Sequence, residues 1–143
     1  MHDVRITTFG YLHNAGLWGR LWALLTGRGG TPPPAHITLD LRKHFKDPHI
    51  NPALRPLTAH DEAVRAAVLI TPGIKELIDA TTAAVLAYLA GPSAGPVTVA
   101  IGCAGGRHRA AAFGMQLSEA LTLLWSVPVT LTHRDLDKAV VDR

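Results

Sequence analysis

The sequence has little of what marks secreted or membrane proteins. It contains a single cysteine, Cys103, and one thiol cannot close an internal disulfide. Its longest apolar stretch, residues 15–25, includes Arg20 and is shorter than the roughly 20 residues needed to cross a bilayer. No basic segment precedes that stretch, so a signal peptide is not expected. We therefore expect a soluble, cytoplasmic protein with no membrane segment.

The sequence also lacks the usual metal and nucleotide-hydrolysis motifs. None of its eight histidines forms a pair at i, i+4 with a glutamate between, and no cysteine–histidine cluster has zinc spacing. No Gly-Lys-Ser/Thr follows a glycine and four spacer residues, so a Walker A loop is excluded. We expect no cofactor and no metal. A three-histidine metal site from His13, His108 and His133 is a minor alternative.

Length and composition favour one small globular domain. The chain has 143 residues, of which 48% are hydrophobic, so a core can form and disorder is not expected. Lysine and arginine number 14 against 11 acidic residues, giving a net charge of +3. This mild basic excess suits a phosphorylated ligand or weak contact with nucleic acid.

The hydrophobic pattern predicts an α/β fold with a small, mostly parallel sheet and flanking helices. A domain spanning residues 1–143 is expected, with a Trp-rich insertion at about 14–34 that reads either as a helix packed on the core or as a lid or dimer contact. Alternating or continuous apolar runs predict strands at 4–9, 36–41, 97–101 and 127–131. Helical spacing predicts helices at 61–70, at 72–90 with Thr71 as N-cap and Pro72 at the first position, and from the glycine turn through Leu124.

A glycine-rich turn at residues 102–109 carries the clearest chemical signal. It reads Gly-Cys-Ala-Gly-Gly-Arg-His-Arg between a buried strand and a helix. Parallel sheets bind ligands at this position, and a helix N-terminus offers free N–H groups that favour an anion. Arginine can pair two phosphate oxygens at once. The sequence therefore predicts a phosphate site, against the simpler interpretation of a helix-start turn with solvated basic residues.

The same turn also fits a Cys-x5-Arg pattern formed by Cys103 and Arg109. In such a loop a thiolate of low pKa attacks phosphorus, so a phosphatase acting on a small phosphate ester is the alternative function. The competing interpretation is a small buried cysteine beside the loop. That interpretation is favoured for two reasons. The residue before Cys103 is Gly102 rather than a histidine, and the residue after Arg109 is Ala110, which has no hydroxyl to assist the leaving thiolate. Enzyme activity stays open, with a non-catalytic role favoured.

Several motifs, in order, resemble the C-terminal domain of the RapZ (YvcJ-like) family. Residues 9–13 (Phe-Gly-Tyr-Leu-His) resemble the family's Phe-Gly-Phe-Lys-His, and residues 40–42 (Asp-Leu-Arg) its Asp-Val-Arg. Pro-His at 48–49 and Leu-Arg-Pro-Leu-Thr at 54–58 are similar to its Asn-Pro-His and Leu-Arg-Pro-Met-Thr stretch. The most specific matches are Val-Ala-Ile-Gly-Cys-Ala-Gly-Gly-Arg-His-Arg at 99–109 and His-Arg-x-Leu at 133–136. The resemblance runs from about residue 4 to 136 and does not include the family's N-terminal P-loop kinase-like domain.

This resemblance implies a fold similar to part of phosphofructokinase and a domain that senses an amino-sugar phosphate, glucosamine 6-phosphate. In some family members the domain also binds small RNA and presents it to an endoribonuclease. By position, the residues implied to line the sugar-phosphate pocket are His13, Arg42, Gly105, His108 and Arg109. Ala104 and Ala110 stand where the family has a threonine and a serine. The family's basic tail has few basic residues here, and they alternate with acidic ones.

Together these observations predict a regulatory domain that binds a phosphorylated metabolite, either an amino-sugar phosphate or a nucleotide. Expected further partners are RNA or a regulatory protein, and a homo-oligomer is expected. The predicted ligand-binding residues are His13, Arg42, Arg55, Gly102, Cys103, Ala104, Gly105, Gly106, Arg107, His108, Arg109 and His133. The predicted RNA contacts are Arg134, Lys138 and Arg143.

Overall fold

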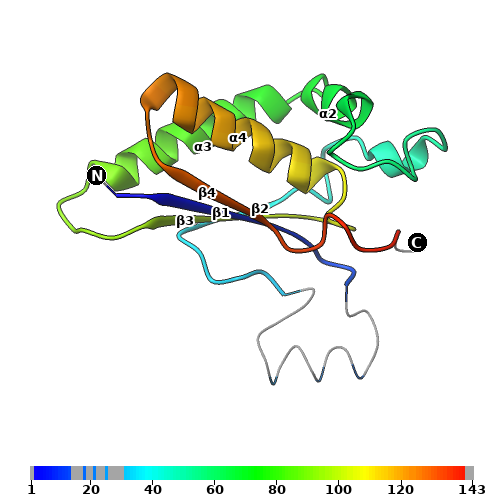
Figure 1. Ribbon diagram of the computed structural model, residues 1–143, viewed down its shortest axis with the longest axis horizontal. Helices are drawn as coiled ribbons and strands as arrows, with labels where there is room; N and C mark the ends of the chain where they lie inside the picture. Colours follow the sequence, from blue (N-terminus) through cyan, green and yellow to red (C-terminus); the bar gives the residue numbers. More distant parts are fainter. Residues whose placement is uncertain (1, 14–17, 19–20, 22–24, 26–30, 141–143) are drawn as a thin grey trace.

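A four-stranded parallel sheet forms the centre of the protein. The computed structural model describes residues 2–13, 18, 21, 25 and 31–140. Within them the strands are β1 (Val4–Gly10), β2 (Ile37–Asp40), β3 (Val97–Cys103) and β4 (Val129–His133). Their order across the sheet is β2-β3-β1-β4, and each neighbouring pair is parallel. The predicted α/β fold with a mostly parallel sheet is therefore confirmed (Figure 1).

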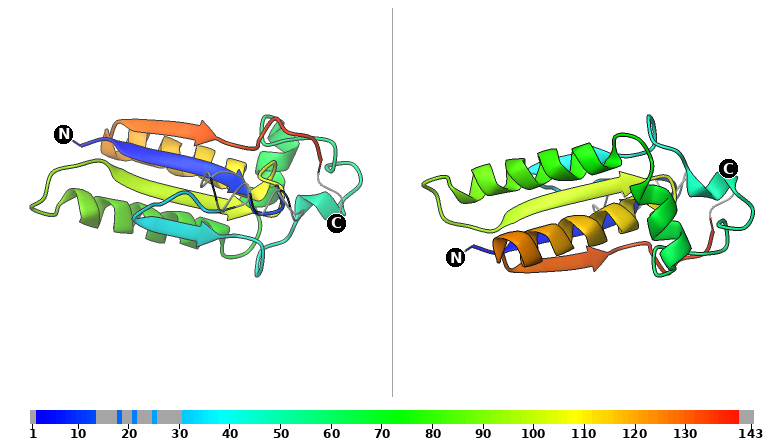
Figure 2. Two further views of the ribbon diagram at one scale, coloured as in Figure 1. Left: turned by 90° about the horizontal axis from the view of Figure 1, so that it is seen from below. Right: turned by 90° about the horizontal axis from the view of Figure 1, so that it is seen from above.

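Two long helices cover one face of this sheet. The helical elements of the described residues are the 3-10 turn η1 (Pro48–Ile50), α2 (Glu62–Leu69), α3 (Ile74–Leu89) and α4 (Arg109–Trp125). The two views in Figure 2 show α3 and α4 lying side by side over the strands, with α2 beyond the carboxyl ends of the strands. Since α4 links β3 to β4, it crosses the intervening strand β1.

The core lies between the sheet and these helices. Alternate residues of the central strands point to one face, so Ile6 and Ile101 are fully buried together with Phe113 and Leu117 of α4. Gly114 allows the close approach of α4 to β1, because a Cβ atom there would lie 2.6 Å from Cγ2 of Thr8.

The predicted cap of the third helix is wrong. Helix α3 begins at Ile74, and its N-cap is Gly73 in the left-handed region at φ 89°. The hydroxyl of Thr71 instead donates to the carbonyl oxygen of Ala67 at 3.0 Å. Thr71 therefore closes the end of α2, and glycine makes the turn into α3 because it tolerates positive φ without strain.

The Trp-rich insertion predicted at about 14–34 lies mostly outside the described residues. Of its apolar positions the structure describes Trp18, Leu21 and Leu25, and all three side chains are exposed. In the part of the chain that is described, no helix combines the length and the hydropathy that a membrane span requires.

Candidate functional site

The loop between β3 and α4, residues 104–108, lies at the carboxyl edge of the sheet, and residues 102–106, from the end of β3 into this loop, are buried. The chain that continues from β1 holds the loop in place. The backbone N–H groups of Tyr11 and Leu12 donate to the carbonyl oxygens of Cys103 and Ala104, each at 2.9 Å. The side chain of His13 donates through Nε2 to the carbonyl oxygen of Gly105 at 3.0 Å. The loop is therefore tied by its carbonyl groups to the end of β1.

Two glycines allow this close contact between the loop and β1. Gly106 has φ 75°, and a Cβ atom on it would lie 2.9 Å from the nitrogen of Gly10. On Gly10, a Cβ atom would lie 2.5 Å from the carbonyl carbon of Gly105. No larger residue fits at either position without a backbone shift, because the atoms that would clash belong to the main chain.

A buried carboxylate completes the junction, and the sequence analysis did not select it. Oδ2 of Asp135 accepts from the Gly10 N–H at 2.7 Å, and Oδ1 contacts the Lys138 ammonium. Burial raises the pKa of Asp135, but the bonds from Lys138 and Gly10 outweigh it and hold this pKa below its ordinary value. The position two residues after the end of β4, inside the His-Arg-x-Leu motif, is the sequence signal that marks this residue.

The start of α4 presents backbone N–H groups beside this loop. The first residue whose amide bonds back to the N-cap is Ala112, which donates to the carbonyl oxygen of His108 at 2.9 Å. The amides of residues 109–111 therefore precede the helical hydrogen-bond ladder. The side chain of His108 makes no capping hydrogen bond to them. Within the loop, the N–H of Gly106 donates to Sγ of Cys103 at 3.3 Å.

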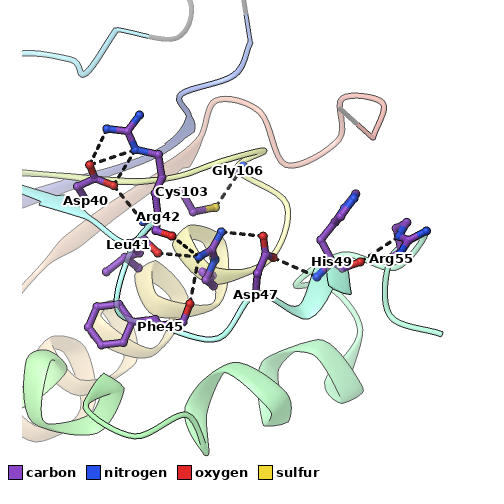
Figure 3. Close-up of polar contacts among 10 residues, drawn as sticks. Asp40, Leu41, Arg42, Phe45, Asp47, His49, Arg55, Cys103 and Gly106 are labelled. Carbon is purple, nitrogen blue, oxygen red and sulfur yellow. Dashed lines mark hydrogen bonds and ion pairs between the residues drawn. The ribbon is translucent and has the colours of Figure 1, made fainter. Parts of the chain in front are cut away.

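Arg109 holds the neighbouring loop rather than lying at the surface. Its side chain is 3% exposed. One terminal nitrogen donates to the carbonyl oxygens of Leu41, Arg42 and Phe45 at 2.8, 3.1 and 3.2 Å. The other donates to Oδ2 of Asp47 at 2.9 Å (Figure 3). Arg109 thus fixes residues 41–47 to the first turn of α4.

Arg107 and His108 secure a second segment, residues 56–57. A terminal nitrogen of Arg107 donates to the carbonyl oxygen of Pro56 at 2.9 Å, and the other contacts the carbonyl oxygen of Lys138. Nε2 of His108 donates to the carbonyl oxygen of Leu57 at 2.8 Å. These side chains position the loops around the helix start through main-chain contacts.

Four side chains form a row at the carboxyl edge of the sheet, on the face opposite α3 and α4. The guanidinium carbon of Arg42 lies 3.7 Å from the ring centre of Tyr11, and that ring meets the Phe9 ring edge-on at 4.8 Å. The guanidinium carbon of Arg134 lies 4.9 Å from the Phe9 ring centre. Gly102 lies beneath the two rings, since a Cβ atom there would approach Tyr11 to 2.4 Å. The row packs cations against aromatic rings, which is a favourable arrangement.

The remaining candidate residues lie apart from the loop or make other contacts. Nδ1 of His133 lies 2.7 Å from Oγ1 of Thr8 on the helix-covered face, and burial lowers the pKa of this histidine. Arg55 is exposed and donates through Nε to the carbonyl oxygen of His49 at 2.9 Å. Arg143 lies outside the described residues. Among the residues that are described, no cluster of three metal-ligating side chains occurs.

The sequence of this chain matches one protein family. The family model described as "RapZ C-terminal domain" matches residues 2–137. The chain belongs to this family. A "Nucleotide-binding protein" of Clavibacter michiganensis is 40% identical over 112 residues, which cover 76% of this chain and 38% of the relative. A protein of the same name from Thermobifida fusca is 35% identical over 136 residues, covering 93% of this chain and 40% of the relative.

A third relative agrees with these two in extent. The "Nucleotide-binding protein" of Rubrobacter xylanophilus is 37% identical over 131 residues, covering 85% of this chain and 42% of the relative. The chain of this RapZ-family protein thus spans about two fifths of the length of the curated relatives that it matches. The similarity includes the loop at 102–109, because the matched family region runs through it.

Proposed function

We propose that this RapZ-type domain binds a phosphorylated small molecule at the carboxyl edge of its sheet and serves a regulatory, non-catalytic role. The observation that carries the proposal is the junction of β3 and α4. There a buried glycine loop leads into a helix whose N-cap residue, His108, makes no side-chain capping hydrogen bond to the first amides. Such a helix start favours a phosphate through its N–H groups and its dipole. The name shared by the relatives, "Nucleotide-binding protein", is in keeping with a phosphorylated ligand.

The phosphate in this proposal is recognised by main-chain amides rather than by Arg109. Both terminal nitrogens of Arg109 donate to residues 41–47, so this arginine positions the site and adds positive charge beside it. Two ligand classes fit the proposal, an amino-sugar phosphate and a nucleotide, because each carries the phosphate that the helix start selects.

Amide hydrogen exchange with matched ligands tests the proposal. We expect glucosamine 6-phosphate or AMP to slow exchange in peptides that cover residues 104–111, whereas glucosamine and adenosine leave it unchanged. The matched pairs separate the phosphate contribution from that of the sugar or the base. Equal protection by the phosphorylated and unphosphorylated compounds, or no protection by any of them, contradicts the proposal.

A further inference from the structure

A surface groove with mostly apolar walls runs between helices α3 and α4, which lie side by side (Figure 2). Two adjoining hollows of about 440 and 340 Å³ share Asp79, Ala120 and Leu124 in their walls. Leu124 is 76% exposed, and Trp125 at the end of α4 is 55% exposed. Large apolar side chains that gather at an exposed groove mark a site for an apolar partner.

The Trp-rich insertion carries an exposed apolar stripe, formed by Trp18, Leu21 and Leu25. These residues are helical, and their exposed fractions are 82%, 43% and 85%. Their spacing of i, i+3 and i+7 places them on one face of a helix, as in helices that bind grooves. The stripe spans about 10 Å along a helix axis, and the α3 wall of the groove, from Lys75 to Leu86, spans about 17 Å. The stripe therefore fits lengthwise within the groove.

The insertion and the groove helices carry opposite charges. Residues 14–30 contain two arginines and no acidic residue. Helices α3 and α4 expose three acidic side chains, Glu76, Asp79 and Glu119. Their one exposed cation, Lys75, is paired with Asp79 at 2.8 Å. Charges of opposite sign on two surfaces speed their encounter and favour one orientation.

The insertion is anchored on the side of the sheet opposite the groove. The carbonyl oxygen of Thr31 accepts from Arg134 at 3.0 Å, and the Arg134 guanidinium carbon lies 4.9 Å from the centre of the Phe9 ring. Neighbouring side chains of a strand point to opposite faces, and it is Thr8 that faces Gly114 of α4. The insertion thus ends on the face away from α3 and α4, and the groove of a second molecule is the complement that matches it.

We propose that Trp18, Leu21 and Leu25 of one molecule dock in the α3–α4 groove of a second copy of this chain. Such a contact joins two different surfaces, so each end of a pair keeps a stripe or a groove for a further molecule. Assembly therefore continues head to tail beyond the dimer as protein concentration rises. None of residues 102–109 lines the groove, so this inference does not depend on the proposed function.

Sedimentation equilibrium over a wide range of protein concentration tests the contact. The average mass of the unmodified protein should rise past that of a dimer. Leu124→Asn in the groove and Trp18→Ser in the stripe should each weaken association about tenfold or more, as loss of a central apolar anchor does. Leu123→Asn is the matched control, because Leu123 is 70% exposed on the same helix but lines neither hollow. Circular dichroism should show the same helix content in all variants, since the three replaced side chains are exposed.

A mixture of the two variants tests whether stripe and groove bind each other. Leu124→Asn keeps an intact stripe, and Trp18→Ser keeps an intact groove. At a concentration where each variant alone is mostly monomeric, an equal mixture should form dimers and nothing larger, because only one contact can form.

Four results would overturn the inference. The unmodified protein may stay monomeric at every concentration, or the mixture may associate no more than the separate variants. Association lost in Trp18→Ser but kept in Leu124→Asn would show that the stripe contacts another surface. Monomeric protein that sediments with vesicles of anionic phospholipid, and does so less in Trp18→Ser, would assign the stripe to a membrane surface instead.

Discussion

Arg109 and Asp47 form an ion pair at 2.9 Å in which the arginine side chain is 3% exposed and the carboxylate 15% exposed. The pair joins the first turn of α4 to the residue before η1, and three carbonyl oxygens accept hydrogen bonds from a terminal nitrogen of the same guanidinium. The arginine that ends the Cys-x5-Arg pattern is thus part of the framework around the loop.

Replacing Arg109 should strongly destabilise the fold. Arg109→Ala removes the arginine donor from Oδ2 of Asp47 and from three carbonyl groups, and removal of one partner from a buried pair costs about 3–5 kcal/mol. Urea denaturation would measure the loss of unfolding free energy. Lys75→Ala is the control, since it removes the exposed pair with Asp79, and it should leave the midpoint nearly unchanged. Equal midpoints for the two variants would contradict the framework role of Arg109.

Acid stability should depend on Asp135. Its pKa is lower in the folded protein than its ordinary value, so the unfolded chain binds more protons below about pH 5. The stabilising contribution is therefore present above the unfolded pKa and is lost as pH falls through the folded one. In Asp135→Asn the unfolding free energy should be lower at pH 7 and should fall less steeply between about pH 5 and 3.

Urea denaturation at several pH values measures the unfolding free energy as a function of pH. Asp137→Asn is the control because Asp137 is an exposed neighbour. A slope in Asp135→Asn as steep as in the unmodified protein would show that other carboxylates govern acid unfolding.

Gly114→Ala should destabilise the protein, although alanine is the better helix former. In an open helix this change is favourable by about 1 kcal/mol. Here the added Cβ would lie 2.6 Å from Cγ2 of Thr8, and overpacking costs about 1–3 kcal/mol. Thr8→Ser removes that methyl group and keeps the hydroxyl that meets His133. The loss of unfolding free energy caused by Gly114→Ala, measured by thermal unfolding, should be smaller in the Thr8→Ser background. If the losses from the two substitutions simply add in the double variant, the added Cβ does not clash with the Thr8 methyl group.

We predict no phosphatase activity that depends on Cys103. Its side chain is buried, with 3% exposure of the residue, and the terminal nitrogens of Arg109 are committed to residues 41–47. A transferred phosphoryl group needs both a reachable thiolate and an arginine fork. An assay with an aryl phosphate should show no turnover above background. Turnover that is abolished by Cys103→Ser would show that the protein is a Cys103-dependent phosphatase, the alternative function.

RNA binding, if measured, should be weak and sensitive to salt. Two of the candidate cations are engaged within the protein, Arg134 with Phe9 and the Thr31 carbonyl oxygen, and Lys138 with Asp135. Each released phosphate contact on a single strand lowers log affinity with a slope of about 0.7 in log salt. Filter binding of a structured RNA at two salt concentrations measures this slope. Tight binding at physiological salt that is lost in Lys138→Gln would show that the tail is an RNA surface.

The sequence was sufficient to predict the strands and the loop because their signals are local. Continuous apolar residues mark β3, and helical spacing after the glycines marks α4. The predicted strand at 97–101 extends in fact to Cys103, since Gly102 and Cys103 still pair with β1 although their small side chains look like a turn.

Contacts between distant segments explain what could not be predicted. The spacing places Arg109 at a helix start, but only the tertiary fold shows that residues 41–47 surround its side chain. Asp135 belongs to a tail of alternating charges that is typical of a solvated segment. Its burial arises because the Gly10 N–H lies opposite it once the sheet has formed.

The position of β1 between β3 and β4 has a consequence for synthesis on the ribosome. Val4 pairs with both Val97 and Val129, so β1, which precedes the other described strands of the sheet in the sequence, pairs with its described neighbours only after residues 97–103 have been made. During that interval its apolar residues, among them Ile6 and Phe9, are open to other chains or to chaperones. Pairing across such long separations also slows folding. Folding of this domain is therefore a late event that follows translation of β3, and a pause in translation before that point prolongs the exposure of β1.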